Sequence, residues 1–164
     1  MAWFDNEDKI ELHSSVFIPV SREDEEIVFN HVYDIEKFFK WFNFIPVVWL
    51  SFNKKKLEVG GLGSIYFTMP FFYYKLKVTE VIPGKFIALT GTEGPMRGNE
   101  YYKFKPQKDG IVMEQVLILS GKNKFFHNYY VHCLVPNHQP FMNWRYSVLK
   151  KQIRKELEKT KKLL

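Results

Sequence analysis

The chain has 164 residues, with 24 Lys and Arg against 18 Asp and Glu, which gives a formal net charge of +6. The charge is uneven: residues 1–36 hold ten acids and two bases, residues 37–144 six acids and fourteen bases, and residues 145–164 two acids and eight bases. This distribution does not imply a surface that binds polyanions uniformly.

Aromatic residues make up 18% of the chain, and they must either fill a large core or line a cavity. The single cysteine, Cys133, excludes an internal disulfide framework and a Cys-rich zinc site. No signal peptide is recognised, and no apolar run reaches the roughly 18–20 residues that span a bilayer. We therefore expect a cytoplasmic protein.

The first predicted elements are a strand and a broken helix. Residues 15–20 alternate in polarity, which predicts a strand. Ser21 is a candidate N-cap for a helical stretch of about 20 residues, which we expect to break near Tyr33 and Asp34 into two short helices.

The middle of the chain changes to period two, the spacing of strands, and turn signals separate its segments. Short turns favour an antiparallel meander. In the third strand we expect Phe72, Tyr74, Leu76 and Val78 to face inward. The predicted strands are 47–53, 62–69, 71–82, 85–93, 99–106 and 111–120.

Residues 121–138 fit neither a strand nor a helix clearly, whereas apolar residues recur at helical spacing after Pro140. The pattern predicts one long amphipathic helix over 139–162, with Lys150, Lys151 and Arg154 on its solvated face.

Several short motifs, taken in order, resemble one known superfamily. They are 16–21 (VFIPVS) before an acidic helix start, 34–41 (DIEKFFKW), 61–64 (GLGS), 78–84 (VTEVIPG), 104–110 (FKPQKDG) and the final helix. Together they resemble the START-like SRPBCC superfamily, which includes polyketide cyclases and lipid-transfer domains. The resemblance covers about residues 14–160, which indicates a single domain over 1–164.

The resemblance implies an α+β helix-grip fold, in which a curved antiparallel sheet wraps around a long C-terminal helix and two short helices follow the first strand. It also implies a cavity between sheet and helix, where a hydrophobic ligand would bind. The alternative for these aromatic residues is a plainly packed core. The predicted ligand-binding residues are Tyr66, Phe72, Tyr74, Glu100, Tyr102, Phe104, Tyr130, Met142, Tyr146, Leu149 and Ile153.

Four potential metal ligands, His127, His132, Cys133 and His138, fall within twelve residues. Their spacing places the three histidines on no common helical or strand face, so we expect neither a metal nor a cofactor. Glu100 is the best candidate for acid–base chemistry, because strand parity groups it with inward-facing residues. No nucleophile motif, phosphate loop or dinucleotide fingerprint occurs.

The sequence thus favours a protein that binds a hydrophobic or aromatic small molecule. One alternative is an enzyme of the polyketide cyclase/dehydrase type that uses the same cavity. A second is an interaction protein whose basic C-terminal helix meets RNA, the ribosome or a membrane. Binding of nucleic acid or membrane is disfavoured, because a solvated helix face explains the lysines equally well.

Overall fold

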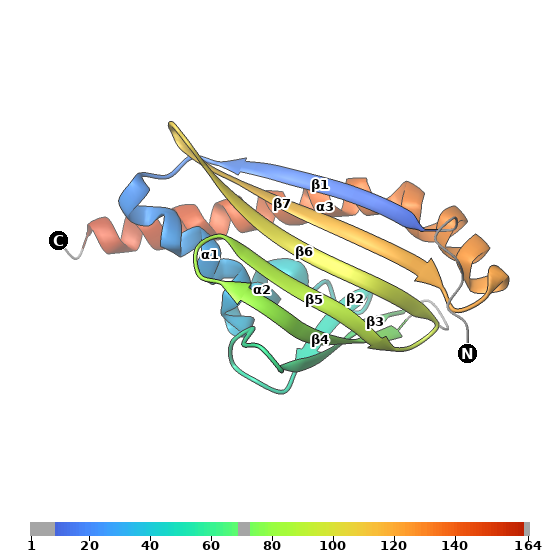
Figure 1. Ribbon diagram of the computed structural model, residues 1–164. Helices are drawn as coiled ribbons and strands as arrows, with labels where there is room; N and C mark the ends of the chain where they lie inside the picture. Colours follow the sequence, from blue (N-terminus) through green and yellow to red (C-terminus); the bar gives the residue numbers. More distant parts are fainter. Residues whose placement is uncertain (1–8, 69–72, 163–164) are drawn as a thin grey trace.

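The computed structural model describes residues 9–68 and 73–162. The chain begins with a strand and short helices, continues with six strands in succession and ends with a long helix (Figure 1). The elements are β1 (Ile10–Ile18), η2 (Arg22–Asp24), α1 (Glu25–Tyr33), α2 (Ile35–Phe42), β2 (Val48–Phe52), β3 (Leu62–Phe67), β4 (Tyr73–Ile82), β5 (Phe86–Glu93), β6 (Met96–Gln107), β7 (Gly110–Gly121) and α3 (Lys124–Lys161).

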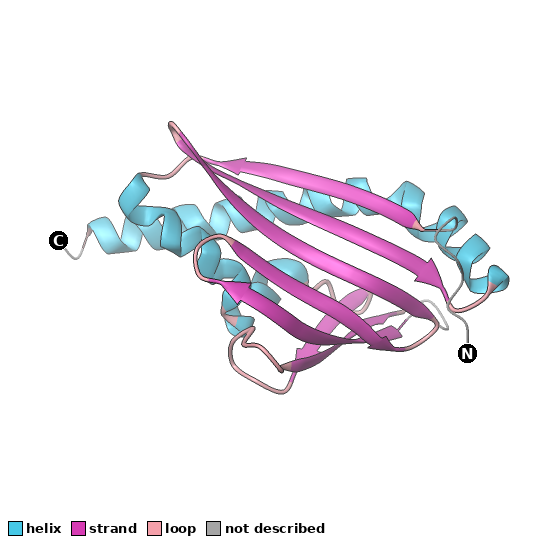
Figure 2. Ribbon diagram, viewed as in Figure 1, coloured by secondary structure: helices cyan, strands magenta, loops and turns pink. Residues whose placement is uncertain are grey.

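The seven strands form one antiparallel sheet in the order β1-β7-β6-β5-β4-β3-β2. Strands β2 to β7 are the predicted meander, and β1 pairs with the free edge of β7. The helices lie together on one side of the sheet, which leaves its other face to solvent (Figure 2). The predicted α+β helix-grip architecture is therefore confirmed, including the two short helices after the first strand.

The break between α1 and α2 falls at Asp34, as predicted. The backbone of Asp34 is extended, and its side chain accepts a hydrogen bond from the backbone N–H of Lys37 at 3.1 Å. This is an N-cap, and it explains why a new helix begins here. At the predicted cap Ser21 the hydroxyl instead donates to the Asp24 carboxylate at 2.7 Å, so the expected capping bond is wrong.

The last helix is much longer than predicted. It begins at Lys124, where the Asn123 side chain accepts from the backbone N–H of Phe126 at 3.1 Å, and it continues through Pro136 and Pro140. The ambiguous segment 121–138 is thus mostly helix. A proline inside a helix removes a backbone hydrogen bond, so the two prolines led us to predict the start of this helix too late in the chain.

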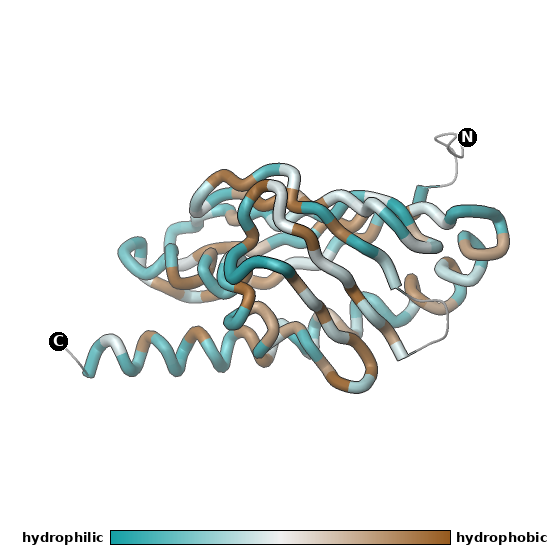
Figure 3. The backbone as a smooth tube through the Cα atoms, turned by 90° about the horizontal axis from the view of Figure 1, so that it is seen from below, coloured by the Kyte–Doolittle hydropathy of each residue, from teal (hydrophilic) through white to brown (hydrophobic). Residues whose placement is uncertain are grey.

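Beyond Pro140, α3 is amphipathic as predicted. Brown and teal segments alternate along its C-terminal half (Figure 3). Met142, Tyr146, Leu149 and Ile153 are buried against the sheet and α2, whereas the lysines and Arg154 are exposed. None of the helices in the described part of the chain is long and apolar enough to span a bilayer.

Candidate functional site

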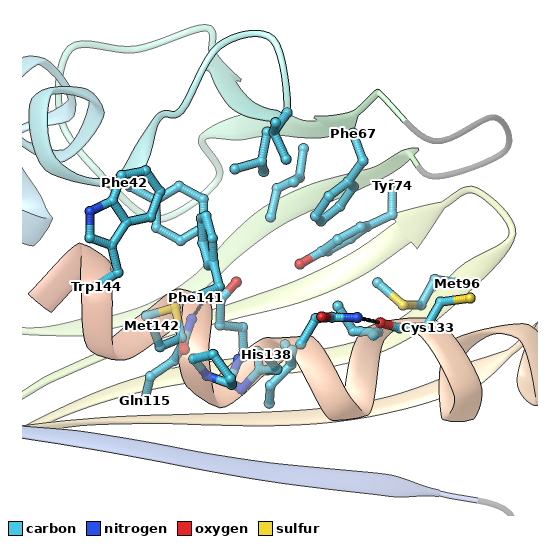
Figure 4. Close-up of a pocket in the computed structure, with 18 residues that line it drawn as sticks. Phe42, Phe67, Tyr74, Met96, Gln115, Cys133, His138, Phe141, Met142 and Trp144 are labelled. Carbon is cyan, nitrogen blue, oxygen red and sulfur yellow. Dashed lines mark hydrogen bonds between the residues drawn. The ribbon is translucent and has the colours of Figure 1, made fainter.

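A cavity of about 500 Å³ lies between the sheet and the middle of α3 (Figure 4). The sheet side is made by residues whose side chains point toward α3 from β2 to β4 and from β6 and β7. Most of them are apolar, so the walls repel water and suit a hydrophobic ligand. The lining residues from the strands and the loop before β2 are Val47, Val48, Ile65, Phe67, Tyr74, Met96, Glu100, Gln115 and Leu117.

The helical side of the cavity comes from the end of α2 and the proline-containing stretch of α3. Phe42 and Phe141 meet edge to face, with ring centroids 6.0 Å apart. Pro136 lacks the N–H that would bond the His132 carbonyl in an α-helix. The next residue, Asn137, donates from its side chain to the Cys133 carbonyl at 2.7 Å. The helical lining residues are Phe42, Cys133, Leu134, Asn137, His138, Pro140, Phe141, Met142 and Trp144.

Glu100 is the only carboxylic acid among the described lining residues, and only 3% of its surface is exposed. Its Oε1 accepts hydrogen bonds from the Tyr102 hydroxyl and from Nε2 of Gln115, both at 2.5 Å. Burial raises the pKa of Glu100, and the two hydrogen bonds oppose that shift. Both donors bind Oε1, so Oε2 makes no hydrogen bond with a described residue.

A chain of buried polar groups supports this carboxyl from behind. Ser14 on β1 donates from Oγ to Oε1 of Gln115 at 3.1 Å. Its Oγ also lies 2.8 Å from the hydroxyl of Tyr146 on α3, which is left to donate because the Ser14 proton is committed. Gln115 therefore cannot rotate without breaking bonds on both sides, and the orientation of its amide toward Glu100 is fixed.

His138 is a further titratable group of the cavity, and unlike Glu100 it was not predicted from the sequence. Only 7% of its surface is exposed, and its Nε2 is buried without a hydrogen-bond partner among the described residues. Burial lowers its pKa to about 4, so the imidazole is neutral at pH 7. Across the cavity, the hydroxyl of Tyr74 points toward α3 (Figure 4).

Arg145 holds the end of α2 beside the cavity without lining it. Its guanidinium donates from Nε to the Trp41 carbonyl at 2.6 Å and from Nη2 to the Asn43 carbonyl at 3.3 Å. It also lies 4.5 Å from the ring centre of Trp144, which is 44% exposed at the cavity rim. This side chain thus fixes α2 and the rim relative to each other.

Only some of the predicted site residues line the cavity. Tyr74, Glu100 and Met142 line the cavity. Six others are buried but are not among its lining residues: Tyr102, Phe104, Tyr130, Tyr146, Leu149 and Ile153. Phe72 lies outside the described residues.

Tyr66 is the clear misplacement. It is 37% exposed and stacks on its cross-strand neighbour Trp49, with ring centroids 5.5 Å apart, whereas the adjacent Ile65 is buried and lines the cavity. The expectation that Tyr66 faces the cavity is wrong. Period two identifies two faces of a strand but not which of them is the inner one.

Several cavity residues were missed because the start of α3 was missed. His138 lies four positions before Met142, so the two share a helix face once the helix extends through Pro140. The other potential metal ligands in this segment do not join it in a cluster. No group of three or more His, Cys, Asp or Glu side chains suited to a metal occurs among residues 9–68 and 73–162.

Comparisons with known proteins place the chain by fold. No family model matches the sequence, and no curated protein matches it. Protein TTHA0849 from Thermus thermophilus superposes with a TM-score of 0.65 at 13% identity, over 90% of this chain and 99% of that one.

Two other solved structures superpose comparably. Norcoclaurine synthase from Thalictrum flavum, in complex with dopamine and hydroxybenzaldehyde, has a TM-score of 0.62 at 16% identity, over 90% of this chain and 87% of that one. Protein Ms6760 from Mycobacterium smegmatis has a TM-score of 0.62 at 11% identity, over 87% and 89%. These likenesses show that the chain has the helix-grip fold that its sequence motifs indicated.

Proposed function

We propose that this protein binds a hydrophobic or aromatic small molecule in the cavity between the sheet and α3. The observation that carries the proposal is the cavity itself, which has a volume of about 500 Å³, mostly apolar walls and a few polar groups. This is the usual composition of a site for a small molecule. On the basis of the sequence, we also propose that the protein acts in the cytoplasm. Residues 1–164 would form a single domain.

The arrangement of polar groups supports binding over plain core packing. Glu100, Tyr74 and His138 sit on different elements and line the same space. In a core that served only stability, the Nε2 of His138 and the Oε2 of Glu100 would cost free energy, since neither has a hydrogen-bond partner among the described residues. Norcoclaurine synthase, which shares the fold, is solved with two small aromatic compounds, and this favours the same use of the cavity here.

Native mass spectrometry of freshly purified protein tests the proposal, with an apolar fluorescent dye as an added probe. We expect a co-purifying small molecule, or dye binding that this molecule displaces. Leu134→Trp places a large ring in the cavity and should weaken dye binding at least about tenfold. Val131→Trp, on the same helix but outside the lining, should bind the dye like the wild type. Equal dye binding by the two folded variants would refute the cavity as the site.

The polyketide cyclase/dehydrase-like alternative has one observation in its favour. Glu100 and His138 both have shifted pKa values and both line the cavity, a pattern that is frequent in active sites. Incubating the co-purified molecule with fresh protein and following its mass separates a carrier from an enzyme. A change of mass that Glu100→Gln and His138→Gln both abolish would establish turnover.

A further inference from the structure

The described lining of the cavity offers a carboxyl group but no ammonium or guanidinium group. Its 18 described residues include one carboxylic acid, Glu100, and one histidine, and none of them is Lys or Arg. The composition does not explain why Lys and Arg are missing from this lining, because the chain as a whole has more bases than acids. The described lysines of β4 and of the C-terminal half of α3 are exposed on the outer surface.

Arg145 follows the lining residue Trp144 in the chain, and its guanidinium is already engaged. Its guanidinium donates to the Trp41 and Asn43 carbonyls and stacks against Trp144. Arg145 is not among the lining residues, and both of its hydrogen-bond partners are neutral carbonyls. An anionic ligand would find no positive partner in the cavity among the described residues.

Glu100 also has no positive partner among the described residues. None of the ion pairs involves it, and both of its donors, Tyr102 and Gln115, are neutral and bind the same oxygen, Oε1. Its second oxygen, Oε2, makes no hydrogen bond with a described residue, and Glu100 lines the cavity. Oε2 is therefore available to a ligand.

The charge of the ligand then decides how well it is accepted. A ligand ammonium next to Oε2 forms an ion pair in a site of low dielectric, and each charge compensates for burial of the other. A ligand hydroxyl forms a neutral hydrogen bond there. A carboxylate, by contrast, must be buried beside a second carboxyl group with no cation to compensate it, which is costly.

On the premise that the proposed function is correct, we propose that the cavity selects hydrophobic ligands by charge, with Glu100 as the residue that sets the selection. The cavity accepts amines most readily and neutral hydroxyl compounds next, and it rejects carboxylates. Fatty acids and other carboxylate amphiphiles are therefore excluded as ligands, and an amine-bearing aromatic compound is the best match.

Isothermal titration calorimetry at pH 7.5 with three compounds of one shape tests this selection. Naphthylethylamine, naphthylethanol and naphthylacetate differ in charge but share their ring. We expect the wild-type protein to bind the amine at least about tenfold more tightly than the carboxylate, with the alcohol between them. Glu100→Gln should abolish the advantage of the amine, whereas Glu158→Gln, which removes an exposed carboxylate on α3, should retain it.

The outcomes separate this proposal from the one on which it rests. Equal binding of the three compounds, or tightest binding of the carboxylate, would overturn the charge selection and leave the cavity as a binding site. No binding of any of them, together with no co-purifying molecule, would overturn both. If Glu100→Gln does not fold, the wild-type protein alone decides, because naphthylacetate should bind at least about tenfold more weakly than its neutral methyl ester.

Discussion

The hydroxyl of Tyr102 donates a hydrogen bond to the carboxyl of Glu100 at 2.5 Å, although the two residues are only two positions apart on β6. Side chains at this spacing share a face of the strand. Gln115 completes the group because β7 pairs it with Tyr102 and places it diagonally to Glu100, to which it donates at 2.5 Å. A polar site is thus built on two rigid paired strands.

Tyr102→Phe should lower the free energy of unfolding by about 1–2 kcal/mol, because it removes the hydrogen bond to Glu100 and the one that the hydroxyl accepts from Nε2 of Gln115. It should also raise the pKa of Glu100, since the bond from Tyr102 holds that pKa down. Urea denaturation measures the first effect, and carbon-detected NMR of the carboxyl during a pH titration measures the second. Tyr101→Phe, on the other face of the same strand, is the matched control. An unchanged Glu100 pKa in Tyr102→Phe would contradict the assigned bond.

His138 should make stability depend on pH. Its pKa is about 4 in the folded protein against an ordinary 6.5, so the unfolded chain binds more protons between these values. The stability that the neutral imidazole provides is complete above pH 6.5 and is lost as the pH falls to about 4. The loss amounts to at most about 3 kcal/mol.

His138→Gln should remove that slope, as measured by denaturation at several pH values. His132→Gln, at an exposed position on the same helix, should retain it. Taking the difference between the wild type and His138→Gln cancels the contribution of Glu100. That contribution has the opposite direction, because a raised carboxyl pKa lowers stability as the pH rises. A His138→Gln profile parallel to the wild type would show that the imidazole is not buried.

Arg145→Met should destabilise the protein by about 2–3 kcal/mol, because the Trp41 and Asn43 carbonyls lose their donor. The emission of Trp144 should also change, since the guanidinium lies over its ring. Thermal unfolding and tryptophan fluorescence measure the two effects. Arg154→Met, at an exposed position further along α3, should change the free energy of unfolding by less than about 0.5 kcal/mol.

Pro136→Ala should stabilise the protein, because an interior helical proline costs up to about 3 kcal/mol relative to alanine. The side chain is exposed and does not line the cavity, so the substitution costs little packing. We expect Tm to rise by about 3–8 °C in calorimetry. Pro83→Ala, in the turn between β4 and β5, should not raise Tm. A lower Tm for Pro136→Ala would show that the proline does not destabilise α3 at this position.

Much of the fold could be predicted from local patterns. Alternation of apolar and polar residues located the six strands of the meander, because a sheet with one buried face requires it. The first strand was predicted too late, at 15–20, whereas β1 spans Ile10–Ile18. The acidic residue Asp34 marked the break between α1 and α2, since a side-chain acceptor is what starts a new helix. The inward face of β4 was also correct for Tyr74, Leu76 and Val78, which are all buried.

The remainder of the site depended on contacts between distant segments. The sequence by itself determined the order of the elements, the meander and the amphipathic face of the last helix, because these follow from periodicity and caps. Only the tertiary structure decided that α3 runs through two prolines, that Tyr66 points to solvent, and that Glu100 and His138 line one cavity. Packing across the chain outweighs the local cost of a proline and chooses which face of each strand is buried, and neither term can be calculated from a residue's neighbours in the sequence.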